Sequence, residues 1–147
     1  MSLPTSGGGD EGSPRVVSGV CASALTTAIA ALITAGSEVP GTNVILSTGA
    51  NREFTVVSDG DFVQGVIEDY GYITKTTYWI TVRLYGYLDK AGAWWPARLI
   101  LTHYYYSAPS LGDSILFKSS TQVKSDNAGC GRVISVNTSE ETCDIVI

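Results

Sequence analysis

Short apolar runs separated by clusters of Gly, Asn, Asp and Ser fill the chain from Gly41 to its C-terminus. These runs are NVILST, EFTVVS, FVQGVIED, TYWITVRLYGYL, ARLILTHYYYS, SILFKSS, GRVISV and TCDIVI. They are rich in β-branched and aromatic residues, and several alternate between apolar and polar positions, which is typical of strands. No long helical period follows Gly36. The pattern therefore predicts a mainly β fold, arranged as a barrel or a sandwich.

A helical pattern lies near the N-terminus, between Ser23 as a candidate N-cap and Gly36 as a stop. A short amphipathic helix is the favoured prediction, and a strand over 31–35 is the alternative. The segment is too short and too rich in threonine to span a bilayer, and Asp10 and Glu11 precede it where a signal peptide would carry basic residues. Four apolar residues share one helix face: Leu25, Ile29, Leu32 and Ile33.

The C-terminus predicts a hairpin, because residues 137–141 have turn composition between two β-rich segments. In the expected register Cys143 faces Ile134, and Cys130 lies near Ile147. The two sulfurs are then several residues apart, whereas a disulfide needs Cα atoms within about 7 Å. We therefore predict that Cys130 and Cys143 remain unbonded and that Cys143 is a small buried hydrophobic residue.

Two parts of the chain share one plan: Gly with a polar residue, an apolar strand, a polar stretch, a Gly-kinked strand and a terminal strand. We predict a single β-rich domain over 16–147, containing a pseudo-repeat of 41–86 and 112–147 around an insertion over 87–110. The matched positions are Gly41 with Gly112, Gly65-Val66-Ile67 with Gly131-Arg132-Val133-Ile134 at a one-residue offset, and Ile80-Thr81-Val82 with Asp144-Ile145-Val146.

Composition narrows the classes of partner. Residues 1–15 are rich in Gly, Ser and Pro, which predicts a flexible N-terminal arm unless a partner orders it. A net charge of −5 with only nine Lys and Arg argues against nucleic acid. Charged residues make up 16% of the chain, which suggests that other subunits or a partner cover part of its apolar surface.

Motifs for catalysis are absent from the sequence. There is a single histidine, His103, and neither a serine-hydrolase elbow, a paired-histidine metal motif nor a phosphate loop. The carboxylates cluster in turns without the spacing of an EF-hand, as at 59–61 and 68–69, where Asp stabilises the backbone. Three irregularly spaced cysteines indicate a reducing compartment. We expect no enzymatic activity, no cofactor and no metal.

The aromatic segment over 87–110 holds two of the three Trp and four of the eight Tyr. In an extended chain Ile100, Thr102, Tyr104 and Tyr106 share one face, and Leu101, His103 and Tyr105 share the other. Three interpretations stay open: a strand covered on both faces, a subunit or capsid interface, or a surface for sugar stacking. Trp94 and Trp95 point to opposite faces if that dipeptide is extended.

Several stretches together resemble the capsid decoration, or cement, proteins of tailed bacteriophages. They are FTVVSDGDFVQGVIED, ITVRLYGYL, LGDSILFKSS, AGCGRVISV and ETCDIVI, and the similarity covers roughly 33–147. The chain departs from the simplest members of that family over 87–110 and in the alanine-rich segment before Gly36.

The resemblance implies a compact β-barrel or β-tulip, a homotrimer, and a viral structural protein bound to the major capsid protein. It places the protein on the outer surface of the virion capsid after synthesis in the host cytoplasm, without membrane or nucleic-acid contacts. The alternative is a carbohydrate- or receptor-binding β-module displayed on a virion. The expected interface residues are Pro14, Arg15, Val16, Val17, Trp94, Trp95, Tyr104, Tyr105 and Tyr106.

Overall fold

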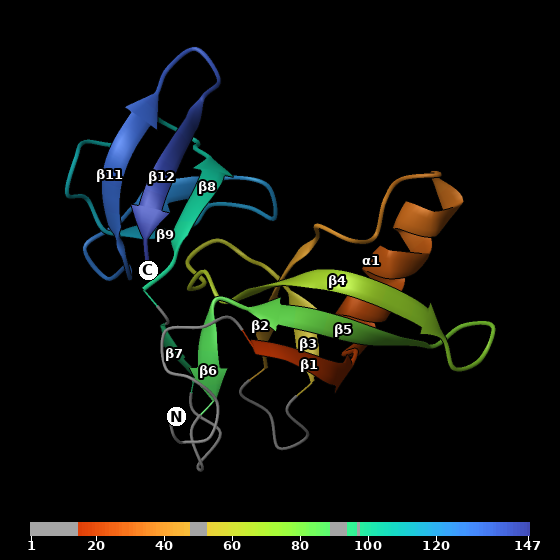
Figure 1. Ribbon diagram of the computed structural model, residues 1–147. Coiled ribbons are helices and arrows are strands. Elements are labelled where there is room, and N and C mark those ends of the chain that lie inside the picture. The colour runs from red at the N-terminus through yellow and green to blue at the C-terminus, as the bar shows by residue number, and fades with distance from the viewer. Residues whose placement is uncertain (1–14, 48–52, 89–93, 97) are drawn as a thin grey trace.

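The computed structural model describes residues 15–47, 53–88, 94–96 and 98–147, with backbone alone for Arg15, 87–88 and 94–96. The fold is mainly β, as predicted, with one helix within these residues (Figure 1). The elements in chain order are β1 (Arg15–Val20), α1 (Ser23–Thr34), β2 (Asn43–Leu46), β3 (Phe54–Val56), β4 (Gly65–Tyr72), β5 (Tyr78–Leu84), β6 (Gly86–Leu88), β7 (Trp94–Pro96), β8 (Ile100–Tyr104), β9 (Ile115–Phe117), β10 (Val123–Ser125), β11 (Arg132–Asn137) and β12 (Thr142–Val146).

Helix α1 confirms the predicted helix and not the alternative strand. Its inner face buries Leu25 and Ile29 completely, and these belong to the apolar stripe seen in the sequence. The N-cap is Ala22 rather than Ser23, and it makes no side-chain cap bond. At the other end Gly36 has a φ of 71°, and the Gly36 and Ser37 N–H groups donate to the Ile33 and Leu32 carbonyls. This is the Schellman arrangement, which ends the helix where a residue without Cβ is favoured.

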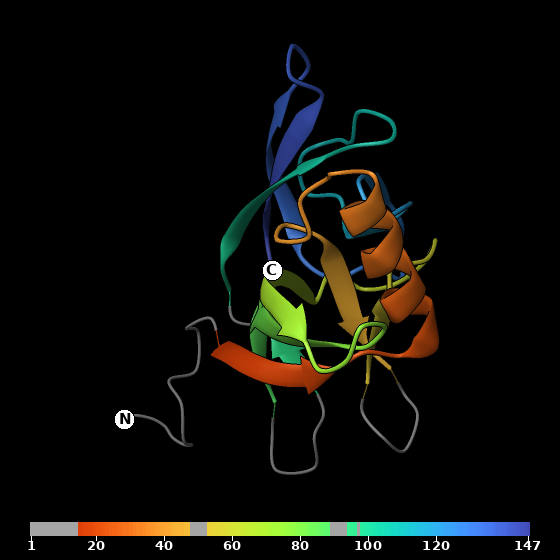
Figure 2. The same ribbon diagram turned by 90° about the vertical axis from the view of Figure 1, so that its right-hand side faces the viewer.

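The first sheet has the order β1-β5-β4-β2-β3, with every neighbouring pair antiparallel. It curls so far that its two edges meet at one parallel bridge, between Cys21 after β1 and Phe54 in β3. Helix α1 packs beside β3 (Figures 1 and 2). The residues of β5 alternate between buried and accessible, so one face of the sheet lines a core and the other is outward.

The second half contains the sheet β11-β12-β8 and the pair β9-β10. Strands β11 and β12 confirm the predicted C-terminal hairpin, but its register is different. Cys143 lies opposite Val136 rather than Ile134, because the turn occupies residues 138–141 and is centred one residue later than the expected register requires. Beyond that pair the register shifts between Val133 and Ser135 and leaves Ile134 in a bulge. Cys130 makes an isolated bridge to Ile115, and it precedes Gly131, which lies beside Ile147 at the open end of the hairpin.

The strands form separate sheets of five, three, two and two strands, and no closed barrel is present among the described residues. The smallest sheets are β9-β10 and β6-β7. The expected barrel or β-tulip is therefore not seen as a continuous ladder. Its place is taken by two strongly curled units. The first is closed by one isolated parallel bridge, and the second by one parallel and one antiparallel bridge.

The two halves of the chain share one order of strand pairings. Strand β8 pairs with β12 as β1 pairs with β5, and the hairpins β11-β12 and β4-β5 correspond, as do β9-β10 and β2-β3. Tyr105 after β8 makes a parallel bridge to Val123, as Cys21 does to Phe54. By these pairings the two copies cover residues 15–84 and 100–146. The second copy therefore includes β8, which lies in the segment 87–110 that was predicted to be an insertion.

The matched positions also shift once the pairing is known. In both halves a register irregularity lies within the strand that follows the glycine, after Ile67 in β4 and after Val133 in β11, so these two residues correspond without an offset. Counting along the paired strands, Cys143 then corresponds to Ile80, one residue away from the sequence match. Both side chains are fully or almost fully buried. Cys143 therefore fills the core position that isoleucine fills in the first half.

A small turn occurs three times and explains several of the glycines. In each copy the third residue is a glycine with φ between 88° and 96°, as a type II turn requires. Its N–H and the carbonyl of the fourth residue make a pair of hydrogen bonds of 2.8–2.9 Å to one buried strand residue. The turns at 39–42, 58–61 and 110–113 hold Ile67, Phe117 and Val133 respectively.

The buried side chains form two clusters rather than one. The first is enclosed by α1 and the five-stranded sheet and draws its members from residues up to Leu84. The second is built from β8–β12 but also includes Val57 and Val63 from the segment before β4. Asn43 adds a hydrogen bond between the halves, because its side-chain amide donates to the Ser120 carbonyl at 2.7 Å.

Candidate interaction surfaces

The outer face of the first sheet carries exposed apolar side chains on β1 and β5. Val16 and Val20 on β1 are about half exposed, and Trp79 on β5 lies directly opposite Val20. Val17 instead packs against the first core, so of the two predicted valines only Val16 is outward. This β1-β5 face follows directly from the period-two pattern of the two strands.

Trp79 is fixed by a glycine on the neighbouring strand. A Cβ atom placed at Gly71, its partner in β4, would lie 2.4 Å from the indole ring. The ring therefore lies across the Gly71 backbone, which only a residue without a side chain permits. At the other end of the face Arg83 pairs with Glu68 at 3.0 Å between exposed groups. The β1-β5 face is thus an apolar strip with one ion pair beside it.

Strand β8 presents a second outward face in the equivalent position of the second half. Ile100 and Tyr104 are 65% and 61% exposed, although they belong to a paired strand. Between them Thr102 donates to Asp144 at 2.6 Å, and Ser135 donates to the other oxygen of the same carboxylate at 2.7 Å. These bonds lower the pKa of Asp144, with Thr102 the larger cause.

The alternation predicted for β8 is confirmed, and it separates the expected interface residues. Tyr104 and Tyr106 are exposed, whereas Tyr105 is buried in the second core. The Lys118 ammonium lies 4.9 Å from the centre of the Tyr106 ring, within cation–π distance. In this chain one face of β8 is covered and the other is open, so the interpretation with two covered faces does not hold.

Four of the expected interface residues have no described side chain. Pro14 lies outside the described residues, and Arg15 is seen only through its backbone at the start of β1. Trp94 and Trp95 contribute backbone pairing to β7, opposite Leu88 and Tyr87. Their predicted role in an interface stays a prediction.

The sequence did not single out the end of the β4-β5 hairpin, which lies away from β2 and β3 (Figure 1). Tyr72 and Ile73 are 57% and 61% exposed there. The Tyr72 ring makes an edge-to-face contact with Tyr70 and a tilted contact with Tyr78, and Tyr70 and Tyr78 also meet edge to face. Tyr72 and Ile73 lie between two of the apolar runs, and nothing in the sequence pattern shows that these apolar residues are exposed.

His103 is a core-facing residue. Its ring makes edge-to-face contacts with Tyr85 and Phe117, with centroids 6.1 and 6.0 Å away. Its buried Nε2 atom has no hydrogen-bond partner. Burial lowers the pKa of His103 to about 4, so the ring is neutral at pH 7. Its partner on β12 is Cys143, whose thiol has a pKa raised to about 11, so the two groups do not form an activated thiolate–imidazolium pair.

The carboxylates at 59–61 lie in a turn, as predicted, whereas Glu68 and Asp69 lie inside β4 rather than in a turn. Asp61 accepts a hydrogen bond from the Ser58 N–H at 2.7 Å, and Asp69 accepts one from the Tyr70 N–H at 2.8 Å. Asp59 pairs with Lys124 and Lys118, and these bonds lower the pKa of its carboxyl, Lys124 more strongly. No cluster of three or more His, Cys, Asp or Glu side chains suited to a metal ion occurs in the described parts of the chain.

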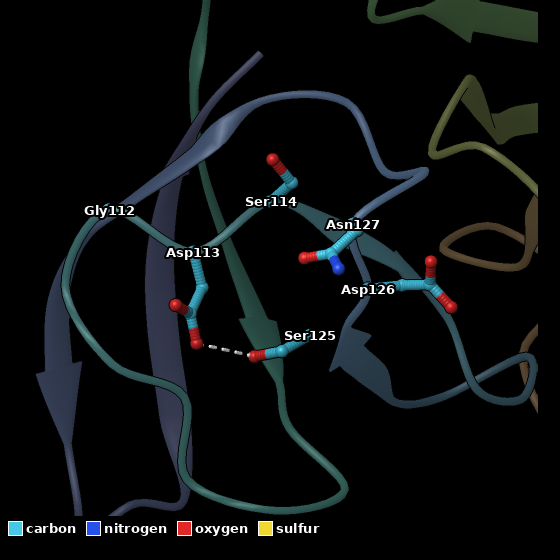
Figure 3. A pocket seen from close by; sticks show the side chains of 6 residues that line it. All are labelled: Gly112, Asp113, Ser114, Ser125, Asp126 and Asn127. Atoms are coloured by element: carbon cyan, nitrogen blue, oxygen red, sulfur yellow. Dashed lines mark hydrogen bonds between the residues drawn. The ribbon is translucent and has the colours of Figure 1, made fainter.

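A polar hollow of about 570 Å³ lies between the turn at 110–113 and the end of β10 (Figure 3). Asp113 accepts hydrogen bonds from the Ser110 N–H and the Ser125 hydroxyl, which lower its pKa, the former more strongly. Asp126 accepts one from the Ala128 N–H at 2.8 Å. No aromatic ring lines this hollow, so it has no platform on which a sugar could stack.

The three cysteines are free, as predicted for Cys130 and Cys143. Burial raises the pKa of all three thiols, in the case of Cys143 to about 11. A thiol that stays protonated is a poor nucleophile and a poor metal ligand.

Comparison with protein-family models, curated proteins and solved structures gives no match to this chain. Among the described residues no helix has both the length and the apolar character needed to cross a bilayer. The surfaces described above are therefore the guide to function.

Proposed function

We propose that this protein is a capsid decoration protein, which binds the outer surface of an assembled bacteriophage capsid as a homotrimer and stabilises it. The proposal starts from the sequence resemblance to cement proteins. The observation that carries it further is the pair of exposed apolar faces at equivalent positions of the two halves. They contain Val16, Val20 and Trp79 in the first half, and Ile100 and Tyr104 in the second.

Both faces suit contact with protein. Aromatic and aliphatic side chains held on paired strands lose little conformational freedom on binding, so their burial is favourable. Each face has polar groups already bonded to one another, as Asp144 is to Thr102 and Ser135. Because these groups keep their partners, covering the face leaves few of them unsatisfied.

A protein of this kind acts by linkage. Anything that binds the assembled shell and not its dissociated subunits shifts the equilibrium towards the shell. Occupancy at a concentration of about 100 times Kd contributes roughly 2.7 kcal/mol per independent site. Repetition over a lattice makes modest contacts large in sum, and trimerisation adds avidity.

The test is to add the purified protein to expanded capsids that lack it, and to measure the number of bound copies and genome release on heating. We expect a copy number close to that of the major capsid protein and release at a higher temperature. Ile100→Asp combined with Tyr104→Asp should lower binding at least tenfold, since both side chains are exposed and the fold is kept.

Leu111→Asp is the matched control, because Leu111 is also an exposed apolar residue but lies in a turn outside both faces. It should bind as the unmodified protein does. Binding at only a few copies per particle would reject the cement function and favour a receptor-binding module. Equal loss of binding in the control would show that the β8 face is not the contact.

A further inference from the structure

The end of the β4-β5 hairpin is an exposed apolar group held on a rigid support. The hairpin tip, defined here as residues 72–77, has both apolar side chains at its start, Tyr72 and Ile73. The Ile73 N–H donates to the Thr77 carbonyl at 2.9 Å, and the Thr74 and Thr77 hydroxyls are 2.7 Å apart. The Tyr72 ring lies 5.3 Å from that of Tyr78. A tip fixed in this way loses little entropy on binding.

A hollow of matching character lies beside helix α1. The α1 pocket has a volume of about 620 Å³, within the roughly 300–1,000 Å³ of pockets that enclose small molecules. Ala28, Ala31 and Leu32 form its helical wall, since residues at i, i+3 and i+4 share one face. Val56 lines it from β3. The small alanine side chains leave the space that makes this surface concave.

The tip and the α1 pocket carry opposite charges. Lys75 is the charged residue of the hairpin tip, and Glu38 is on the lining of the α1 pocket. Both residues are exposed, and within the described part of the chain neither makes an ion pair. An apolar projection with a cation beside it therefore matches an apolar hollow with an anion beside it.

We infer that the hairpin tip of one copy inserts into the α1 pocket of a second copy. Ile73 and Tyr72 enter the hollow, and Lys75 pairs with Glu38 at its rim. Each copy then offers one tip and one pocket, so the contact is head-to-tail and forms a closed ring when the rotation between copies closes. The inference deepens the proposed function, because it supplies the contact for the homotrimer on which that function rests.

The first experiment measures the mass of the purified protein in solution without capsids, by light scattering coupled to size exclusion. We expect three times the chain mass of 15.5 kDa. Ile73→Asp should yield monomer, whereas Ile134→Asp, which changes an exposed isoleucine in the β11 bulge, should leave the mass unchanged. Wild-type protein that stays monomeric, or Ile73→Asp protein that stays trimeric, would overturn the inference.

The second experiment tests the direction of the contact. Ala31→Arg should fill the pocket and also yield monomer, with Ala24→Arg, on the same helix but outside the pocket lining, as its control. Mixing Ile73→Asp protein with Ala31→Arg protein leaves one intact tip and one intact pocket, so a 1:1 dimer should form and grow no further. Lys75→Glu and Glu38→Lys should each weaken association, and the double reversal should restore it.

Absence of the mixed dimer would overturn the head-to-tail arrangement. Capsid binding, measured separately on the same variants, separates this inference from the proposed function. A protein that binds capsids as a monomer, and loses that binding on Ile73→Asp, would assign the tip to the capsid and reject self-association. A protein that trimerises through tip and pocket but does not bind capsids would reject the decoration function alone.

Discussion

His103 shows how a single residue can be explained by its equivalent in the other half. It pairs with Cys143 as Gly19 pairs with Ile80. At Gly19 a Cβ atom would lie 2.4 Å from the Phe54 ring, so there the large side chain comes from β3 and the small one from β1. In the second half Val123 takes the place of Phe54, and the imidazole fills the space instead. The histidine is thus a volume-filling core residue.

That position makes stability depend on pH. The pKa of His103 is about 4 in the folded protein and near 6.5 when unfolded. Between these two pH values the unfolded chain binds a proton at this histidine and the folded protein does not. The free energy of unfolding therefore falls as the pH drops from about 6.5 to about 4, by about 3 kcal/mol in total. His103→Phe should lack this loss and match or exceed the wild-type stability at pH 7, since Nε2 has no partner to lose.

Urea denaturation of both proteins between pH 4 and pH 7.5 measures this effect. The lowered pKa values of Asp113 and Asp144 also give stability that is lost as the pH falls through them. They act in both proteins, so the difference between the two isolates the histidine. A constant difference across this range would contradict the prediction.

Gly131 is a second position where the addition of one atom, a Cβ, should change the stability of the protein. Its φ is 76°, and an added Cβ would lie 2.7 Å from the Val146 carbonyl oxygen. Gly131→Ala should therefore destabilise the protein by about 2–4 kcal/mol, from backbone strain and overpacking together. Gly41→Ala is the matched control, because its φ is 94° but nothing lies within 4 Å of the new Cβ. It should cost about 1–2 kcal/mol in thermal or chemical denaturation, and equal losses at both sites would show that the contact has no effect.

At the scale of elements, the sequence predicted those whose signal is local. Helix α1 and the β11-β12 hairpin follow from apolar periodicity and turn composition. The hairpin register was wrong because every residue from Asn137 to Thr142 suits a turn, so composition does not fix where the turn is centred. The bulge at Ile134 has no distinctive residue that would predict it either. The correspondence of β1 and β8 was missed because it rests on backbone pairing, while their side chains have little in common.

The same limit applies to the interaction surfaces. Val16, Tyr104 and Tyr106 were predicted at an interface and are exposed. Alternation alone could also have separated Tyr105 from its neighbours. The hairpin tip and the α1 pocket were not predicted. Both depend on how far one element extends relative to the elements packed against it, and the pattern of apolar and polar residues does not determine that.

Helix α1 offers a test of a missing local interaction. Its N-cap, Ala22, has an extended backbone with ψ of 160° but no side chain that can accept a hydrogen bond. Ala22→Ser should stabilise the protein by about 0.5–1 kcal/mol, because a hydroxyl can accept from an otherwise unpaired N–H of the first turn. Ala24→Ser, inside the same helix, should be neutral or slightly destabilising in the same urea titration. A loss of stability on Ala22→Ser would mean that the cap geometry is set by the bond from the Ala22 N–H to the Phe54 carbonyl.

At the scale of the whole molecule, the arm before β1 tests the proposed assembly. Residues 1–13 lie outside the described chain, and their composition predicts order only against a neighbouring subunit or the capsid. Limited proteolysis followed by mass spectrometry should remove them from free protein and spare them in decorated capsids. The remainder of the chain should resist the protease in both states and serves as the control. Equal cleavage of the arm in both states would assign it the role of a spacer.

The two cores draw unequally on the two halves of the chain, and this affects the order in which they can form during synthesis. Every described member of the first core lies at or before Leu84, whereas the second core includes Val57 and Val63 from the first half. Because a ribosome releases the N-terminal half first, the first core can form before β8 emerges. The segment that carries Val57 and Val63 is then already folded when the second half emerges and packs against it. A circular permutant beginning at β8 would keep the same strand pairings and lose that order of assembly.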